Sequence, residues 1–143
     1  SIGLGIMLYE GIGDTIRVSL SDDSKQEIEV GYEILKALDL GKKGVQLVAC
    51  PSCGRADVDI RKLANTVDEL LRTMDAPVKV AVMGCEVNGP GEAKDADVGL
   101  AAGNGRAVIF RKGVKARVVD EADMLTALME EVQLVADAMD RNE

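Results

Sequence analysis

Two periods of apolar and polar residues alternate along the chain, and they predict strands and helices in turn. Residues 14–20 place apolar side chains at every second position and include β-branched residues, a pattern typical of a strand. Residues 28–38 carry apolar side chains at helical spacing, and Gly41 is expected to stop that helix. The apolar, glycine-bearing stretch at 2–12 predicts the end of an earlier helix. The strand and the helix after it predict one βα unit of a larger parallel assembly.

A second pattern follows the glycine–lysine stretch 41–44, which is typical of a boundary. Within it, Gly103-Asn104-Gly105 is a strong hairpin signal. The strands expected here are 45–49, 78–83, 98–101, 107–110 and 114–119, and the helices are 60–74 and 124–139. The first two of these strands each lead into a loop that contains cysteine. Because sites in open α/β sheets form at the carboxyl ends of strands, we expect the two cysteine loops to lie together.

Composition narrows the class of protein. The 143 residues, 47% hydrophobic and 29% charged, allow one soluble domain or one domain with a fragment of another. A net charge of −8 and only 2% aromatic residues argue against nucleic acid as a partner. No apolar run approaches the roughly 20 residues that span a bilayer, and nothing points to export, so a cytoplasmic location is expected. The first residue is not Met, and we expect the chain to begin inside a longer protein.

The chemistry centres on three cysteines in a sequence without histidine. Cys50 and Cys53 form a Cys-x-x-Cys pair, and Cys85 stands far along the chain. An odd number of cysteines favours metal binding or catalysis over a disulfide framework. A thioredoxin-like redox pair would leave Cys85 unexplained, and a zinc site would need a carboxylate or a second chain as its fourth ligand. An iron–sulfur cluster with three thiolates and a carboxylate would have one chemically distinct iron. Alternatively, Cys85 is a small buried hydrophobe and the pair is incidental.

The surroundings of Cys85 favour the cluster among these interpretations. Gly84, Gly89 and Gly91, with Pro90, indicate a close-packed turn. Such a backbone can approach a bulky inorganic core and donate N–H groups to its sulfides. Glu92 ends this turn seven residues after Cys85, although most glutamates are simply solvated.

Three segments together resemble the hydroxymethylbutenyl diphosphate synthases of the methylerythritol phosphate (MEP) pathway of isoprene biosynthesis. They are Glu10-Gly11-Ile12-Gly13-Asp14-Thr15-Ile16-Arg17-Val18-Ser19-Leu20, Cys50-Pro51-x-Cys53, and Gly84-Cys85-x-Val87-Asn88-Gly89-Pro90-Gly91-Glu92. The similarity covers nearly the whole chain and weakens through 95–143. Two independent cysteine motifs in the same order make it highly specific.

The resemblance implies a fold class and a set of ligands. The fold would be α/β, with the last βα unit of a TIM barrel at 1–40. An α+β iron–sulfur domain similar to those of sulfite and nitrite reductases would follow at 41–143. Cys50, Cys53, Cys85 and Glu92 would hold a [4Fe–4S] cluster. Most of the barrel would be missing, so the chain by itself is expected to be inactive.

The resemblance also implies an oxidoreductase that opens 2-C-methyl-D-erythritol 2,4-cyclodiphosphate to 4-hydroxy-3-methylbut-2-enyl diphosphate. Arg17 and Ser19 would bind the substrate's diphosphate at the barrel mouth, where an arginine fork and a hydroxyl suit an anion. Asn88 would hydrogen-bond substrate, although an Asn before Gly is also typical of a turn. Glu92 would be catalytic as well as a ligand, because a hard carboxylate exchanges more readily than a thiolate. A stand-alone electron-transfer or metal-binding module is the alternative, and it would have no use for Arg17 and Ser19.

Partners follow from the same reasoning. The full-length family member would be a homodimer and would need an external electron donor, ferredoxin or flavodoxin. Such carriers are usually acidic, and five cations gather in an otherwise acidic chain, namely Arg106, Arg111, Lys112, Lys115 and Arg117. We expect this hairpin to dock the carrier. The competing interpretation is a solvated hairpin whose lysines guard a sheet edge.

Overall fold

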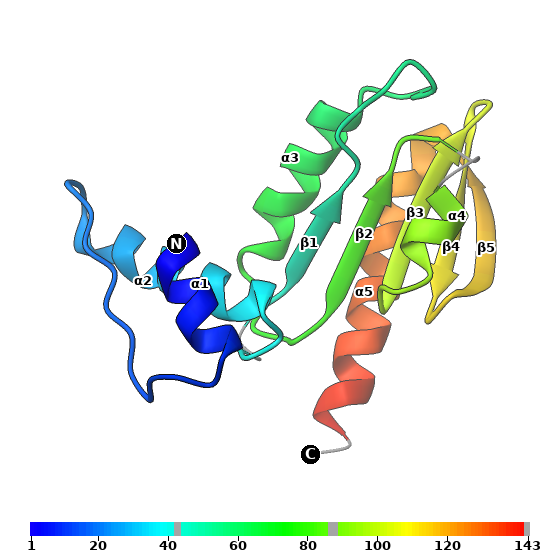
Figure 1. The fold of residues 1–143 in the computed structure, drawn as a ribbon. Helices are drawn as coiled ribbons and strands as arrows, with labels where there is room; N and C mark the ends of the chain where they lie inside the picture. The colour runs from blue at the N-terminus through cyan, green and yellow to red at the C-terminus, as the bar shows by residue number, and fades with distance from the viewer. Residues whose placement is uncertain (42–43, 86–88, 142–143) are drawn as a thin grey trace. The chain divides into compact units, whose positions relative to one another are not determined.

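The computed structural model describes residues 1–41, 44–85 and 89–141, without the side chains of Pro90, Glu92 and Asp140. The chain divides into two compact units, Ser1–Lys43 and Gly44–Glu143 (Figure 1). None of the helices in the described part of the chain has the length and apolar character needed to cross a membrane.

The first unit contains two helices, α1 (Ile2–Tyr9) and α2 (Ser24–Ala37). The side chain of Asp23 caps α2 by accepting a hydrogen bond of 3.0 Å from the amide of Lys25. The prediction that Gly41 stops this helix is wrong. The chain leaves the helix at Ala37, and Asp39 takes a left-handed φ of 55°, which aspartate tolerates better than most residues.

The strand predicted at 14–20 does not form, and the segment is irregular. Its alternation persists, because Ile16 and Val18 are half-buried beside Gly31 of α2 while Arg17 and Ser19 are exposed. A strand needs a neighbour to accept and donate its backbone hydrogen bonds. The described residues of this unit offer no such neighbour, so the predicted βα unit appears as a helix with an irregular segment before it.

The second unit is a mixed five-stranded sheet with helices on both faces, which confirms the α/β class. Its strands are β1 (Gln46–Ala49), β2 (Lys79–Met83), β3 (Val98–Gly103), β4 (Arg106–Arg111) and β5 (Val114–Asp120), in that spatial order. The helices are α3 (Ile60–Leu71), α4 (Gly89–Ala93) and α5 (Met124–Asp140), with a 3₁₀ turn at Glu121–Asp123. Strands β1, β2 and β3 are parallel, and β3, β4 and β5 are antiparallel. The predicted strands and the two long helices are therefore confirmed to within a few residues.

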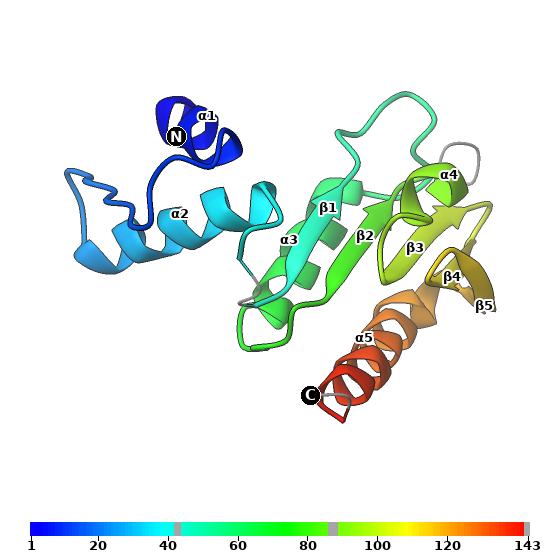
Figure 2. The same cartoon turned by 60° about the horizontal axis from the view of Figure 1, so that its bottom comes forward.

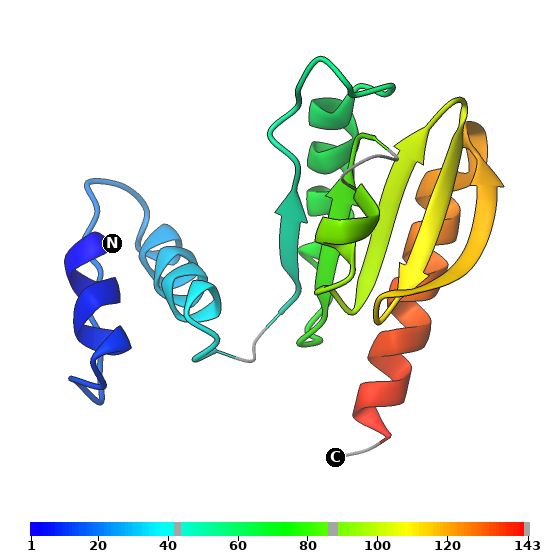
Figure 3. The same cartoon turned by 45° about the vertical axis from the view of Figure 1, so that its right-hand side comes forward.

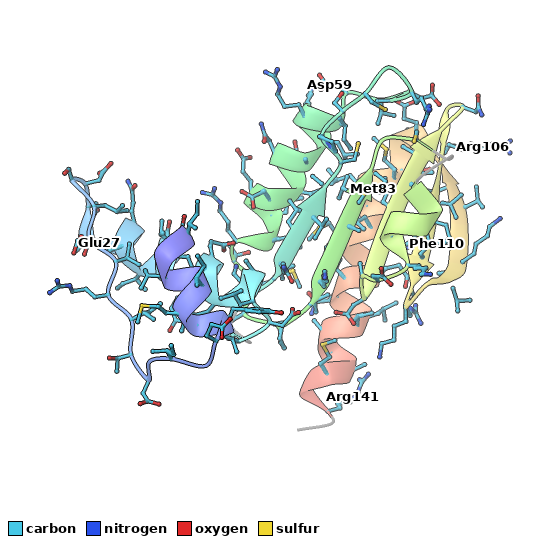
Figure 4. The ribbon with its side chains drawn as sticks, in the orientation of Figure 1. Glu27, Asp59, Met83, Arg106, Phe110 and Arg141 are labelled. Atoms are coloured by element: carbon cyan, nitrogen blue, oxygen red, sulfur yellow. The ribbon has the colours of Figure 1, made fainter. Side chains whose placement is uncertain are left out.

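Helices α3 and α5 cover one face of the sheet, and α4 lies on the other (Figure 3). The main core packs the two long helices on side chains such as Val80, Val82 and Leu100. A smaller core beneath α4 includes Met83 and Phe110, which Figure 4 labels. The short α4 covers β2 and β3, and Val118 of β5 on the same face remains 44% exposed.

The predicted hairpin signal is confirmed at the turn between β3 and β4. Asn104 and Gly105 take positive φ values of 52° and 71°. Asn-Gly is favoured in such two-residue turns because both positions need the left-handed region. The turn between β4 and β5 uses the same geometry, with φ values of 48° at Lys112 and 76° at Gly113.

Candidate functional site

The two cysteine loops leave the sheet at the carboxyl ends of two neighbouring parallel strands (Figure 2). In the register of β1 and β2, Ala49 lies opposite Val82. The amide of Cys50 continues this ladder by donating a hydrogen bond of 3.0 Å to the carbonyl oxygen of Val82. The first cysteine loop therefore begins beside β2, the strand that leads into the second cysteine loop.

A second hydrogen bond joins the loops beyond the end of the sheet. The amide of Asp57 donates to the carbonyl oxygen of Gly84, next to Cys85, at 3.0 Å. A Cβ atom on Gly84 would lie 3.3 Å from the Cβ atoms of both Ala56 and Ile60. The sequence prediction attributed this glycine to the approach of an inorganic core. In the structure, its close neighbours are side chains of the first loop and of α3.

Asp57 and Asp59 secure the first loop at its far end, and sequence reasoning missed both. The side chain of Asp57 accepts a hydrogen bond of 3.3 Å from the amide of Asn104, at the tip of the β3–β4 hairpin. Asp59 caps α3 by accepting a hydrogen bond of 3.0 Å from the amide of Lys62. The sequence signal for the cap was available, since an aspartate directly before an apolar-periodic segment is typical of a helix start.

The three cysteines differ in burial. Cys85 is 8% exposed, Cys50 is intermediate and packs against both cores, and Cys53 is exposed. None of them forms a disulfide. The site therefore contains one buried thiol, Cys85, one partly buried thiol, Cys50, and one thiol exposed to solvent, Cys53.

Residues Gly89–Ala93 form α4, a helix where the sequence pattern predicted only a turn. A Cβ atom on Gly89 would lie 2.6 Å from the Cβ atom of Ala101, so glycine lets the first turn of α4 sit directly on β3. A Cβ atom on Gly91 would meet no other atom within 4 Å, so this glycine faces open space. Glu92 lies within α4, but its side chain is outside the described residues, and so is Asn88 as a whole.

The chemistry of the donor set fits an iron–sulfur cluster. Three thiols, none of them in a disulfide, belong to two loops joined by hydrogen bonds. Among the described side chains, no three of the Cys, Asp and Glu type are grouped closely enough to hold one metal ion. Thiolates are the ligands that iron–sulfur clusters usually take from a protein.

A pocket of about 810 Å³ adjoins the first cysteine loop. Cys50, Pro51 and Ser52 line one side of it, and polar side chains from the first turns of α3 line the other. Asp59 lies at this end of α3 (Figure 4). Of the three cysteines, Cys50 alone is among the lining residues of this pocket.

The remaining sequence candidates, Arg17 and Ser19, belong to the first unit. They lie two residues apart, and both side chains are exposed. Arg17 also borders a pocket of about 380 Å³ between this segment and α2, which is otherwise lined mainly by apolar residues such as Ile28 and Tyr32. The two side chains are thus available to bind an anion.

The cationic side chains of the β4–β5 hairpin lie on both faces of the sheet. Arg111 donates a hydrogen bond of 2.8 Å to Glu131 of α5, which is 5% exposed. Arg117 donates one of 2.7 Å to Glu130 and another to the carbonyl oxygen of Ala127. These two arginines hold the hairpin to α5, and the docking role expected for the hairpin stays a prediction.

Comparisons with known proteins match both parts of the chain. Residues 46–134 match the family described as the GcpE protein C-terminal domain, and residues 1–32 match the GcpE TIM-barrel domain. Relatives named 4-hydroxy-3-methylbut-2-en-1-yl diphosphate synthase (flavodoxin) are identical to this chain at about half of the aligned positions. The protein from Sulfurihydrogenibium sp. (strain YO3AOP1) is 53% identical over 133 residues, which is 93% of this chain and 38% of the relative.

Two further relatives with the same name give the same picture. The protein from Aquifex aeolicus is 53% identical over 93% of this chain and 37% of its own length. The one from Corynebacterium glutamicum is 52% identical over 98% of this chain and 37% of its own length. The chain thus spans less than two fifths of the relatives it matches. On these matches, the chain belongs to the GcpE family of 4-hydroxy-3-methylbut-2-en-1-yl diphosphate synthases.

Proposed function

We propose that this chain is the cluster-bearing part of an oxidoreductase that opens 2-C-methyl-D-erythritol 2,4-cyclodiphosphate to 4-hydroxy-3-methylbut-2-enyl diphosphate. One observation carries the proposal within the structure. The hydrogen bonds from Cys50 to Val82 and from Asp57 to Gly84 hold both cysteine loops at one end of the sheet. The names of the relatives give the product and flavodoxin, and the cyclodiphosphate substrate is what the family resemblance implies.

The proposed ligands are the thiolates of Cys50, Cys53 and Cys85 and the carboxylate of Glu92. When bound, a [4Fe–4S] cluster supplies electrons one at a time to a reaction that consumes two. The three thiolates are soft ligands that suit iron–sulfur chemistry. Glu92 offers a harder oxygen ligand that exchanges more readily, which is why we assign it a catalytic role and not only a binding one.

The proposed substrate contacts are Arg17 and Ser19 of the first unit and Asn88 of the second. Arg17 would bind the diphosphate through its guanidinium fork, and the hydroxyl of Ser19 would donate a further hydrogen bond. Their exposure and their spacing on one side of the segment support this assignment. Asn88 would orient the substrate beside Glu92. Residues 1–40 would be the end of the barrel and 41–143 the cluster domain, related to the domains of sulfite and nitrite reductases.

The partners of the whole enzyme are proposed on the same basis. Relatives carry "flavodoxin" in their name, so flavodoxin, or ferredoxin in its place, is the proposed electron donor. The full-length protein would act as a homodimer in the cytoplasm. The match of residues 1–32 to a barrel family favours this enzyme over a stand-alone electron-transfer module, which has no need of a barrel segment.

The test uses the full-length enzyme purified without oxygen. Its absorption spectrum and its iron and acid-labile sulfide content are measured, together with turnover of the cyclodiphosphate. We expect about four irons and four sulfides per chain. Cys50→Ser, Cys53→Ser and Cys85→Ser should each lose most of this iron. Glu92→Ala should retain an altered cluster but lose turnover.

The matched control is Asp95→Ala, which removes an exposed carboxylate three residues beyond Glu92. It should leave iron content and turnover unchanged. Purified protein that holds zinc and no sulfide would overturn the proposal. So would Cys53→Ser or Glu92→Ala enzyme with the spectrum and activity of the parent.

A further inference from the structure

The open face of β4 and β5 beside α4 forms a groove of about 470 Å³. Its floor is an apolar row across three strands, since Ala101 lies opposite Val108, and Val108 lies opposite Val118. Val118 is 44% exposed, so part of this floor is open to solvent. The floor therefore offers apolar surface that an incoming protein could bury.

Cations border this floor. Arg106 and Lys115 both line the groove, and both are exposed. Among the described residues, Arg106 forms a long ion pair of 3.8 Å with Asp120, and both of these side chains are more than 70% exposed. Exposed pairs of this kind are weak, so the guanidinium is available to another carboxylate. Figure 4 places Arg106 at the start of β4, next to the hairpin tip.

The local charge is unlike that of the rest of the protein. Residues 103–119 hold five Lys and Arg and no Asp or Glu, while the whole chain has a net charge of −8. Arg111 and Arg117 are engaged with α5 on the opposite face. The exposed cations on the groove side, Arg106 and Lys115, would attract an acidic partner.

Two residues that line the groove contact α4 and the first cysteine loop. The floor residue Ala101 is the residue on which Gly89 of α4 sits, one turn before Glu92. Asn104, which also lines the groove, donates its amide to Asp57 in the first cysteine loop. A protein seated in the groove would therefore rest against the elements that carry the proposed ligands. Electron transfer weakens steeply with distance, so this placement suits a redox partner.

We infer that this groove, lined by Ala101, Gly103, Asn104, Arg106, Val108, Lys115 and Val118, docks an acidic electron carrier of the flavodoxin type. The inference rests on the proposed function and adds the place where the carrier binds. Each reduced carrier gives up one electron and is oxidised by one electron. Two encounters supply the two electrons that, with two protons, open the cyclodiphosphate and release one water.

The experiment uses the full-length enzyme with its cluster and a reduced acidic flavodoxin as the donor. The test variant is Arg106→Glu with Lys115→Glu, and the matched control is Arg61→Glu with Lys62→Glu. The control makes the same change in charge at two exposed residues of α3, on the other face of the sheet. The rate of reduction by flavodoxin is measured across a range of ionic strength, and turnover with dithionite is measured in parallel.

We expect the groove variant to be reduced by flavodoxin about ten-fold more slowly at low ionic strength. The difference should shrink as salt screens the charges, and the control should behave as the parent does. Arg106→Gln with Lys115→Gln should give an intermediate rate, which guards against a folding defect in the reversed variant. Turnover with dithionite should persist in every variant, because a small reductant needs no docking surface.

Two results would overturn the inference. One is a groove variant that flavodoxin reduces at the parental rate at low salt. The other is an equal loss of rate in the α3 control. That result would mean that flavodoxin docks elsewhere or that its rate depends only on the net charge of the enzyme. If instead no protein, the parent included, turns over with either donor, the proposed function itself has failed.

Discussion

The amide of Asp57 lies 3.0 Å from the carbonyl oxygen of Gly84, to which it donates a hydrogen bond. This contact joins the residue that follows the Cys50–Cys53 loop to the residue that precedes Cys85. The side chain of the same aspartate reaches the amide of Asn104 at the hairpin tip. One residue thus connects three loops that lie at the same end of the sheet.

Removing the carboxylate of Asp57 should loosen the hairpin tip. Asp57→Ala keeps the main-chain bond to Gly84 but deletes the acceptor for the amide of Asn104. Because that bond is long and exposed, we expect a loss of no more than about 1 kcal/mol in the free energy of unfolding. Hydrogen exchange at Asn104 should become faster, and Asp57→Asn, which keeps an acceptor oxygen, should restore slow exchange. Parental exchange in Asp57→Ala would contradict this role.

Gly89 should not tolerate a side chain. A Cβ atom there would meet the Cβ atom of Ala101 at 2.6 Å and that of Met83 at 3.2 Å. We expect Gly89→Ala to lower the free energy of unfolding by about 1–3 kcal/mol through overpacking, as measured by chemical denaturation. Gly91→Ala, two residues on, meets no atom within 4 Å and should be neutral or slightly stabilising. The double variant Gly89→Ala with Ala101→Gly should recover part of the loss. Equal stability of the two single variants would refute this explanation.

Glu131 should be the carboxylate that holds the β4–β5 hairpin to α5. It is 5% exposed and accepts hydrogen bonds from Arg111, while the Nε atom of Arg117 lies 3.6 Å away. Glu131→Gln should cost about 1.5–3 kcal/mol of unfolding free energy, since it weakens bonds to charged donors in a buried place. The exposed neighbour Glu130 serves as the control, because Glu130→Gln should cost less than about 1 kcal/mol. The reverse order of the two costs would show that the buried contact is not the important one.

The cap of α3 should support the loop that carries Cys50 and Cys53. Asp59→Ala deletes the acceptor for the amide of Lys62, and caps of this kind are worth about 1 kcal/mol. Asp59→Asn should preserve most of the stability, since asparagine is an equally good cap. Thermal unfolding at matched concentrations measures both variants. An asparagine variant as unstable as the alanine variant would indicate that charge, and not capping, is what matters.

Several features could be predicted from the sequence because they depend on neighbouring residues. The strands β1 and β2 follow from short apolar runs, and α5 follows from helical spacing. The hairpin turn at Asn104-Gly105 follows from the need for positive φ at both positions. The position of the two cysteine loops at one edge also followed, since parallel neighbouring strands bring their carboxyl ends together. The roles assigned to Cys50, Cys53, Cys85, Glu92, Arg17, Ser19 and Asn88 stay predictions, and so do the domains 1–40 and 41–143.

Other features depend on residues that are distant in sequence, and only the tertiary structure decided them. The segment at 14–20 has the alternation of a strand, but a strand forms only where a neighbour completes its hydrogen bonds. Gly84 and Gly89 leave little room for a side chain because Ile60 and Ala101 lie against them. No local sequence pattern identifies those neighbours. Arg106 and Arg111 belong to the same strand and look alike in sequence. The sheet directs one to the open groove and the other to Glu131, because the interactions of a charged side chain depend on the face to which packing assigns it.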